Sequence, residues 1–273
     1  MQSQIGEHLS SRYYGYKTTE MGKNKLKKFA EMKTFGCVFE FPFGALRDSG
    51  FDMKGHWREQ YFKNTAPLVL ELGCGKGEYT VGLAKACPDK NYIGIDIKGA
   101  RIWKGAKEAE ENRMVNVAFL RTGIELIENF FAPGEVDEIW ITFPDPQMQK
   151  TRHRLMSARF LQLYSRILKP GGIIHLKTDS PFLFEFSYRL LQENNIIPLT
   201  CQSDLYGAGN VSPEKSIKTF YECQWLARGK KIKLIEFAMP ESREFTDPDE
   251  SDIDRDDYHS FPRGMARQIN NPE

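Results

Sequence analysis

The chain has 273 residues, of which 40% are hydrophobic, 12% aromatic and 27% charged. This composition excludes a wholly disordered chain, and the length suits one large domain with appendages. No stretch approaches the roughly 18 consecutive apolar residues that a membrane-spanning helix needs. The first twenty residues lack the apolar region of a secretory signal.

The five cysteines form no CxxC pair, and the isolated histidines show no metal-ligand spacing. These patterns argue against a zinc ribbon and against a disulfide framework. The sequence therefore predicts a protein without a bound metal that works in the reducing cytoplasm.

The net charge of +1 is the sum of a basic body of the chain and an acidic tail. Residues 240–273 hold ten Asp and Glu against four Lys and Arg, a net charge of −6, which leaves +7 on residues 1–239. A basic body suits a polyanionic partner such as nucleic acid. The acidic tail is either a solvated, disordered terminus or a segment that competes with nucleic acid for the basic face.

Three regions follow from these patterns. Residues 1–35 are lysine-rich and are expected to form a basic, flexible N-terminal arm, which is either solvated or bound to a nucleic acid backbone. Residues 36–239 are expected to form the globular domain, with the aromatics of 37–62 packed onto its core. Residues 240–273 are expected to form the acidic, disordered tail.

From residue 66 the chain alternates between strand and helix patterns. Strands are expected at 67–73, 91–97, 115–121, 136–143, 172–178 and 196–202, and a last strand or hairpin within 218–239. Helices are expected at 78–87, 100–113, 124–131, 157–168 and 180–195. This alternation predicts a Rossmann-like α/β fold with a mostly parallel seven-stranded sheet and helices on both faces.

A glycine-rich loop joins the strand that ends at Leu72 to the next helix. It contains Gly73, Gly75 and Gly77, a pattern that lets backbone amides approach a ligand at a helix N-terminus. Asp96 ends the next strand, where a carboxylate can accept hydrogen bonds from both ribose hydroxyls. Because ligands bind outside the carboxyl ends of parallel strands, four acids are expected on one rim: Glu71, Asp96, Asp145 and Asp179.

The loop does not match a dinucleotide fingerprint, because Glu78 stands where that pattern places its third glycine. The acid at Glu71 suits a ligand that carries cations and hydroxyls better than it suits a pyrophosphate. S-adenosylmethionine has an ammonium, a sulfonium and a ribose, and it has no phosphate. The alternative interpretation is a tight structural turn, which does not account for Asp96 or for the Lys-Pro-Gly-Gly turn at 169–172.

A carboxylate between two prolines follows the fourth expected strand. Pro144 and Pro146 restrict the backbone around Asp145. One carboxylate can accept both donors of the guanine Watson–Crick edge, and this leaves N7 free to face a methyl donor. N7 already carries a lone pair, so its methylation needs positioning and no general base. The alternative for Asp145 is a helix or turn cap.

Basic residues follow directly: Lys150, Arg152, His153 and Arg154. Beside a candidate guanine site such residues favour phosphate binding, although a solvated loop is the alternative. Asp179, at the end of the fifth expected strand, is either a second substrate-binding acid or a structural cap.

Several of these segments occur together, in order and at suitable spacing: ELGCGKG, GID, FPDP with K-x-R-H, KTD, and T-x-x-E at 219–222. Over residues 65–238 the chain resembles the bacterial tRNA (guanine-N7-)-methyltransferases of the TrmB family. The resemblance implies a class I methyltransferase fold, S-adenosylmethionine as methyl donor, and N7 of the variable-loop guanine of tRNA, guanine 46, as acceptor. It leaves open whether the protein is a monomer or a homodimer.

The resemblance also implies residue roles. The cofactor would be held by Glu71, Gly73, Gly75, Gly77, Asp96, Thr122 and Gly123. Asp145 would be the catalytic, guanine-binding acid. The substrate would also be bound by Lys150, Arg152, Asp179, Thr219, Phe220, Tyr221 and Glu222.

Three positions depart from the family pattern. Gly123 stands where the family commonly has an acid near the adenine, and Gln147 stands where it favours tryptophan. The basic stretch after the prolines is about two residues shorter, so Lys150 matches the family lysine only loosely.

Three other functions compete with this interpretation. A methyltransferase acting on an exocyclic amine would want an aromatic residue after the prolines, where the chain has Gln147 and Met148. A non-catalytic RNA-binding protein would not need Glu71, Asp96 and Asp145 together. A small-molecule methyltransferase would not need the basic loop.

Overall fold

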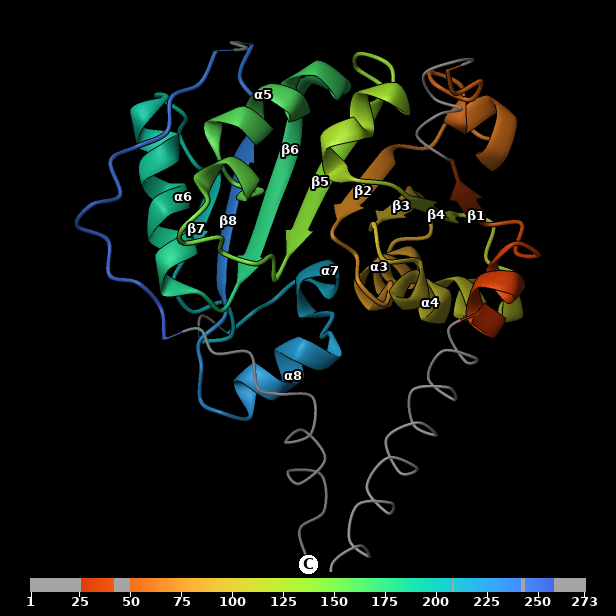
Figure 1. The fold of residues 1–273 in the computed structure, drawn as a ribbon. Coiled ribbons are helices and arrows are strands. Elements are labelled where there is room, and N and C mark those ends of the chain that lie inside the picture. The colour runs from red at the N-terminus through yellow and green to blue at the C-terminus, as the bar shows by residue number, and fades with distance from the viewer. Residues whose placement is uncertain (1–25, 42–49, 208, 242–243, 258–273) are drawn as a thin grey trace, which may run out of the picture.

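The computed structural model describes residues 26–41, 50–207, 209–241 and 244–257. These residues build one sheet of eight strands in the order β1-β4-β3-β2-β5-β6-β8-β7 (Figure 1). Every strand runs parallel to its neighbours except β8, which is antiparallel to β6 and β7. The predicted mostly parallel α/β fold is confirmed, with eight described strands in place of the expected seven.

The strands are β1 (Val38–Glu40), β2 (Leu68–Leu72), β3 (Asn91–Ile95), β4 (Val117–Arg121), β5 (Val136–Thr142), β6 (Leu168–Thr178), β7 (Thr200–Gln202) and β8 (Lys233–Ala238). The α-helices are α3 (Glu78–Ala86), α4 (Gly99–Glu111), α5 (Ala158–Ile167), α6 (Pro181–Glu193), α7 (Pro213–Ser216) and α8 (Phe220–Leu226), and a further helix spans 26–32. A π-helix, η1 (Trp57–Phe62), and two 3₁₀ helices, η2 (Ile124–Asn129) and η3 (Thr151–His153), complete the fold.

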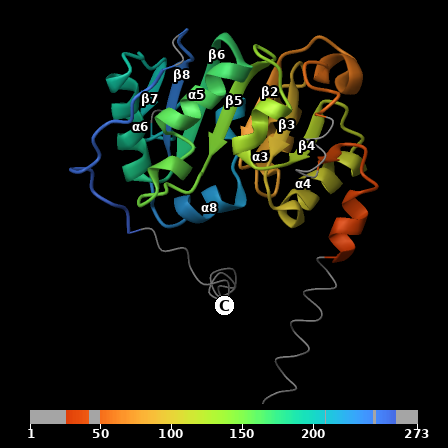
Figure 2. The same ribbon diagram turned by 45° about the horizontal axis from the view of Figure 1, so that its top comes forward.

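Helices cover both faces of the sheet, as Figure 2 also shows. Leu68, Leu70 and Leu72 of β2 point into a core shared with α5, α6, η1 and η2. Val69, between them, points into the opposite core, which α3 and α4 complete. Because both faces of β2 are buried, its sequence is continuously apolar except for Glu71.

The extra strand comes from the aromatic region before the glycine loop. β1 pairs with β4 and extends the sheet at that edge. Trp57 of η1 is fully buried, and its indole nitrogen donates a hydrogen bond of 2.9 Å to the carbonyl of Phe130. The expectation that these aromatics pack onto the core is therefore confirmed.

Within the segment 218–227, expected to be part of a strand or hairpin, Phe220–Leu226 is helical instead. The Thr219 hydroxyl accepts a hydrogen bond of 3.2 Å from the amide of Glu222 and thereby caps α8. This helix-start signal outweighs the strand preference of the aromatic residues that follow it. Only Lys233–Ala238 of this region is a strand.

Parts of both terminal regions belong to the described residues and pack against the domain. Residues 1–25 and 258–273 lie outside the described residues, so most of the predicted arm and half of the predicted tail are not seen. The helix at 26–32 packs on α4, where the indole nitrogen of Trp103 donates a hydrogen bond of 2.9 Å to Glu31. Residues 244–257 run along α6 rather than standing free as a disordered tail (Figure 1).

Across the described ranges, the structure contains no helix that is long and apolar enough to cross a membrane. The same ranges hold no group of three or more His, Cys, Asp or Glu side chains arranged to bind a metal ion.

Candidate active site

The carboxyl ends of the central strands carry the four predicted acids, and a cavity of about 400 Å³ opens beside two of them. Its wall includes Asp96 at the end of β3 and Asp145 after β5. The other predicted cofactor residues on this wall are Gly73, Thr122 and Gly123. The fold thus brings one end of the predicted cofactor site and the predicted catalytic acid into a single cavity.

Asp96 is held by the backbone around it. One carboxylate oxygen accepts a hydrogen bond of 3.0 Å from the amide of Gly75, and the other accepts one of 2.7 Å from the amide of Lys98. Each oxygen keeps a second lone pair, and the side chain lines the cavity. The carboxylate is therefore oriented in advance and can still accept hydrogen bonds from two hydroxyl groups.

The three glycines of the loop all have positive φ angles, but they have different structural roles. Gly73 lines the cavity. Gly77 begins α3 where that helix crosses α4: a Cβ atom there would lie 2.6 Å from the Phe119 ring and 3.1 Å from the Cα of Gly105. Gly77 thus allows close packing of two helices, whereas Gly75 orients Asp96.

Glu71 lies beneath the glycine loop and away from the cavity wall. Its carboxylate accepts hydrogen bonds from the amide and hydroxyl of Thr80, and one of 2.7 Å from the hydroxyl of Thr142. Burial of this side chain raises the pKa of Glu71 to about 7, against the lowering effect of these hydrogen bonds. Glu71 thus connects α3 to β5 and does not line this cavity, and its role at the cofactor stays a prediction.

A second acid stands where the chain has glycine in place of the family acid. The carboxylate of Glu125 folds back over Gly123, with one oxygen 2.8 Å from the position of a Cβ atom on that glycine. Glu125 also lines the cavity, together with the apolar residues Ile97 and Ile124. An acid two residues further along the chain thus lies beside the position at which the family pattern places one.

The loop after β5 is held in a strained conformation. Phe143 and Gln147, on either side of the two prolines, both have a φ of +48°. Such a left-handed conformation costs a non-glycine residue roughly 1–2 kcal/mol. The exposed carboxylate of Asp145 accepts a hydrogen bond of 3.0 Å from the amide of Gln147, and its second oxygen is free of protein donors among the described residues.

Arg154 holds this loop from behind and is fully buried. Its guanidinium donates hydrogen bonds of 2.9 Å and 3.2 Å to the carbonyls of Pro146 and Gln147, and it pairs with Glu250 at 2.5 Å. Its planar group also lies over the ring of Phe186, 3.9 Å from the centroid. The hypothesis that Arg154 belongs to an exposed phosphate-binding cluster is wrong, because this side chain is buried inside the protein.

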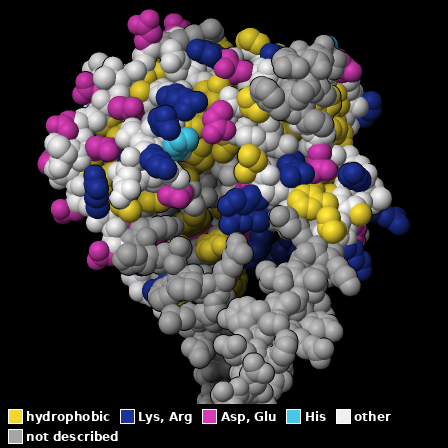
Figure 3. Space-filling model, viewed as in Figure 1, with side chains coloured by type: hydrophobic (Ala, Val, Ile, Leu, Met, Phe, Trp, Pro, Cys, Tyr) yellow, Lys and Arg dark blue, Asp and Glu magenta, His cyan; other side chains and the backbone are white. Residues whose placement is uncertain are grey.

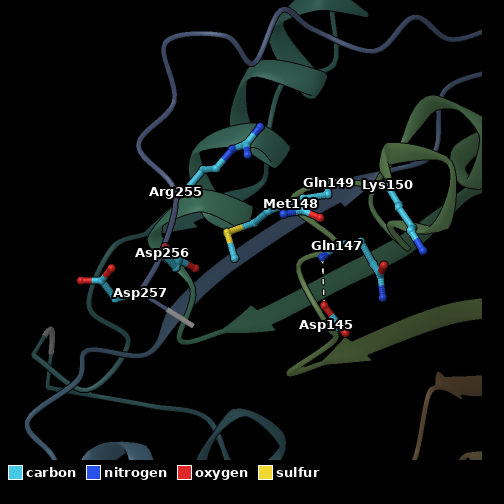
Figure 4. A pocket seen from close by; sticks show the side chains of 8 residues that line it. All are labelled: Asp145, Gln147, Met148, Gln149, Lys150, Arg255, Asp256 and Asp257. Atoms are coloured by element: carbon cyan, nitrogen blue, oxygen red, sulfur yellow. Dashed lines mark hydrogen bonds between the residues drawn. The ribbon is translucent and has the colours of Figure 1, made fainter. Parts of the chain in front are cut away.

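The other members of the basic cluster are exposed on or beside η3. Lys150, Arg152 and His153 are all at the surface, and Figure 3 shows Lys and Arg side chains gathered around a His side chain on this face. Lys150 and Asp145 also line a second cavity of about 470 Å³, closed on its far side by Arg255–Asp257 (Figure 4). Cationic side chains therefore flank the acid that is expected to hold a base.

Asp179 is buried at the end of β6, and one of its carboxylate oxygens lacks the hydrogen bond that a buried oxygen usually accepts. Among the described residues its Oδ2 has no hydrogen-bond partner, and the nearest cation, Lys230, lies 3.9 Å away. Burial raises the pKa of Asp179. A buried carboxylate oxygen without a hydrogen bond is costly, so it points to a donor that the described residues do not supply.

The T-x-x-E segment is divided between structural and exposed residues. Glu222 is fully buried and pairs with the equally buried Lys177 of β6 at 2.8 Å, so it cannot contact a substrate directly in this structure. Thr219 caps α8. Phe220 and Tyr221 are exposed, and Phe220 lies against Lys76 of the glycine loop, 4.5 Å from ring centroid to ammonium.

Comparison with known proteins adds to this geometry. A family model described as a putative methyltransferase matches residues 65–235. The tRNA (guanine-N(7)-)-methyltransferase of Bacteroides fragilis is 52% identical over 243 residues, which cover 89% of this chain and 96% of the relative. The enzyme of the same name from Porphyromonas gingivalis is 54% identical over 241 residues, covering 87% and 98%. The chain belongs to the tRNA (guanine-N(7)-)-methyltransferase family.

Solved structures share the fold of this family member at low sequence identity. The 16S rRNA methyltransferase KamB superposes with a TM-score of 0.53 and 15% identity, covering 67% of this chain and 92% of that one. An antibiotic-related methyltransferase gives a TM-score of 0.50 and 18% identity, covering 66% and 90%. These similarities confirm the predicted Rossmann-like methyltransferase fold.

Sequence reasoning about this family member missed two functional candidates. Glu125 stands two residues beyond the position at which the family pattern places an acid, and an acid in the first turn of η2 is the signal that indicates it. Glu250 lies in the predicted acidic tail, and no local pattern connects it to Arg154, 96 positions earlier.

Proposed function

We propose that this enzyme transfers the methyl group of S-adenosylmethionine to N7 of guanine 46 in the variable loop of tRNA. The observation that carries the proposal is the position of Asp145: an exposed carboxylate, fixed between two prolines, on the wall of the cavity that also contains Asp96. Membership of the tRNA (guanine-N(7)-)-methyltransferase family supports the reaction and the substrate class.

The residues of the cavity fit S-adenosylmethionine. Asp96 has the free lone pairs that two ribose hydroxyls need, and Glu125 can accept a hydrogen bond from the adenine amino group. Ile97 and Ile124 offer apolar surface for the flat adenine ring. When bound, S-adenosylmethionine supplies a methyl group on a sulfonium, which is an electrophile that needs no further activation.

Asp145 would hold the acceptor base. One carboxylate can accept the N1–H and 2-amino hydrogen bonds of guanine, and only its Oδ1 has a partner within the described chain, the Gln147 amide at 3.0 Å. This grip on one edge leaves N7, on the other edge, free to face the cofactor. Since N7 has a lone pair, the contribution of the protein is orientation, an effect worth up to about 7–11 kcal/mol in favourable cases.

The surrounding residues supply sites for the rest of the tRNA. Lys150, Arg152 and His153 would contact phosphates beside the target nucleotide. Phe220 and Tyr221, exposed beside the glycine loop, would stack on an unpaired base. Asp179 has a buried oxygen that a substrate donor could satisfy.

The proposal also assigns the parts of the chain. Residues 36–239 would form the methyltransferase domain, and the lysine-rich arm would contact the tRNA backbone. The enzyme would work in the cytoplasm, where its five free cysteines stay reduced.

The test is to incubate the purified enzyme with labelled S-adenosylmethionine and unmodified tRNA and to map the methylated nucleotide. N7-methylguanosine at position 46 is the expected product. Methylation of an exocyclic amine, or of a different nucleotide, would refute the proposed guanine geometry. The Asp96→Asn variant provides a control that should lose cofactor binding while its tRNA binding stays unchanged.

A further inference from the structure

The described part of the acidic tail follows α6 from its C-terminal end to its N-terminal end. Near the start, the amide of Asn194 donates a hydrogen bond of 2.8 Å to the carbonyl of Thr246. In the middle, Arg189 of α6 pairs with Asp252. Ile253 is buried against the core. This path leads the chain to the edge of the sheet that carries the active site (Figure 1).

At that edge the tail contacts the loop that bears Asp145. Glu250 forms the ion pair with Arg154 at 2.5 Å, and Arg154 in turn binds the carbonyls of Pro146 and Gln147. The side chain of Arg154 is fully buried, whereas that of Glu250 is 28% exposed. Without Glu250, the described structure leaves this buried guanidinium with no counter-ion, which is costly in a site of low polarity.

The tail also contacts two neighbouring helix ends. Asp247 accepts a hydrogen bond of 2.7 Å from the amide of Ala158 and so caps α5, whose N-cap residue Ser157 provides no side-chain hydrogen bond. Asp256 accepts hydrogen bonds from the hydroxyl of Ser180 and, at 3.0 Å, from the amide of Phe182. Ser180 directly follows Asp179, so Asp256 fixes the turn that carries the second predicted substrate acid.

The tail residues finally form one wall of the second cavity, of about 470 Å³, which Asp145 also lines. Arg255–Asp257 line the space opposite Asp145 and Lys150, with Met148 directed towards Asp256 (Figure 4). The acidic side chains of the tail thus fall into two groups according to their contacts. Those at 247, 250 and 256 face protein donors, whereas Asp254 is exposed and has no hydrogen bond or ion pair with the described residues.

We propose that residues 247–256 are a positioning strap of the acceptor site, in which Glu250 acts through Arg154 on the loop of Asp145 and Asp256 acts through Ser180 on the turn of Asp179. The proposal rests on the function proposed above. The strap holds the two acids in the geometry that receives guanine, and none of its residues lines the cavity beside Asp96. Its loss therefore lowers the rate of transfer and leaves cofactor binding unchanged.

The test compares Glu250→Gln with Asp254→Asn, which removes the same charge from the same segment without breaking a contact. Steady-state methyl transfer to tRNA and the Kd of S-adenosylmethionine are measured for both, at a temperature where circular dichroism shows both folded. In Glu250→Gln we expect kcat to fall about tenfold or more, as for small misplacements of a reacting group, with an unchanged cofactor Kd. Asp254→Asn should match the wild type.

A double-mutant cycle tests whether Glu250 acts through Arg154. In an Arg154→Met background, Glu250→Gln should lower kcat no further, because the residue through which it acts has gone. Asp256→Asn provides an independent variant and should lower kcat in the same way, with cofactor affinity retained.

Two results would refute the proposed positioning role of the strap. One is wild-type kcat in both Glu250→Gln and Asp256→Asn. The other is tighter tRNA binding with a higher kcat/KM in Glu250→Gln and Asp254→Asn alike, which would mean that the tail competes with RNA through its charge. The methylated position in wild-type product is mapped in parallel, so a wrong acceptor atom would refute the proposed function while the relative kcat values still test the strap.

Discussion

Replacing Glu71 by glutamine should make the free energy of unfolding of the protein less dependent on pH. The folded-state pKa of Glu71 is about 7 because the side chain is buried, against an ordinary value of 4.5. Between these two values the folded protein holds a proton that the unfolded chain has released. Stability must therefore fall as the pH rises through this window, and the loss is complete above the folded pKa.

The size of the effect follows from the two pKa values. A separation from 4.5 to about 7 corresponds to about 3 kcal/mol, since one pKa unit is equivalent to 1.36 kcal/mol. Glutamine keeps most of the hydrogen bonds: its carbonyl can accept from the Thr80 amide, and its amide can donate to the Thr142 hydroxyl. We therefore expect Glu71→Gln to be close to the wild type at pH 5 and more stable by up to about 3 kcal/mol at pH 8.

Urea denaturation followed by circular dichroism at pH 5, 6, 7 and 8 measures this difference directly. Glu128→Gln is the matched control, because the side chain of Glu128 is half-exposed and, among the described residues, pairs only with Arg166 at the surface. Its free energy of unfolding should run parallel to that of the wild type. If the Glu71→Gln curve were also parallel to the wild type from pH 5 to pH 8, Glu71 would not be the buried, proton-holding group that the structure describes.

Three further predictions concern the site. Asp145→Ala should retain the Kd of S-adenosylmethionine and lose methyl transfer, since the acid faces the acceptor base; turnover like that of the wild type would remove its assigned role. Replacing both Lys150 and Arg152 by alanine should weaken tRNA binding and reduce the slope of log K against log salt by about 2, one for each lost phosphate contact. An unchanged slope would identify this cluster as a solvated loop. Glu125→Gln should raise the Kd of S-adenosylmethionine about tenfold, the usual effect of losing a hydrogen bond to a charged group, whereas Glu128→Gln in the same helix should not. Equal Kd values measured by calorimetry would exclude Glu125 from the adenine site.

The alternation of strands and helices from residue 66 onward could be predicted because it rests on local patterns. A continuous apolar run such as Leu68–Leu72 predicts a buried strand, and a glycine loop followed by an acid 19 or more residues later predicts a nucleoside site, without any knowledge of distant contacts. The same holds for Asp145 between its prolines. These features survive in the structure because the residues that specify them are neighbours in the chain.

Other features depend on which distant residues meet. The carboxylate of Glu71 accepts hydrogen bonds from Thr80 and Thr142 because α3 and β5 pack on either side of it, and no pattern around Glu71 indicates these partners. The KTD and T-x-x-E segments meet through a buried ion pair, Lys177 with Glu222, which leaves Phe220 and Tyr221 as the exposed residues of the second segment. No pattern within either segment indicates which of its residues will be buried.

The contact between the basic loop and the acidic tail shows most clearly what could not be predicted from the sequence. By itself the sequence determined the fold class, the family and the acids at the strand ends, because apolar periodicity and short motifs are local properties. Only the tertiary structure decided that Arg154 is buried behind the loop of Asp145 and that Glu250, 96 residues later, is its partner. An acidic residue looks the same in the sequence whether its side chain faces water or a hydrogen-bond donor of the protein. Only the folded path of the tail shows which acids face water and which face such donors.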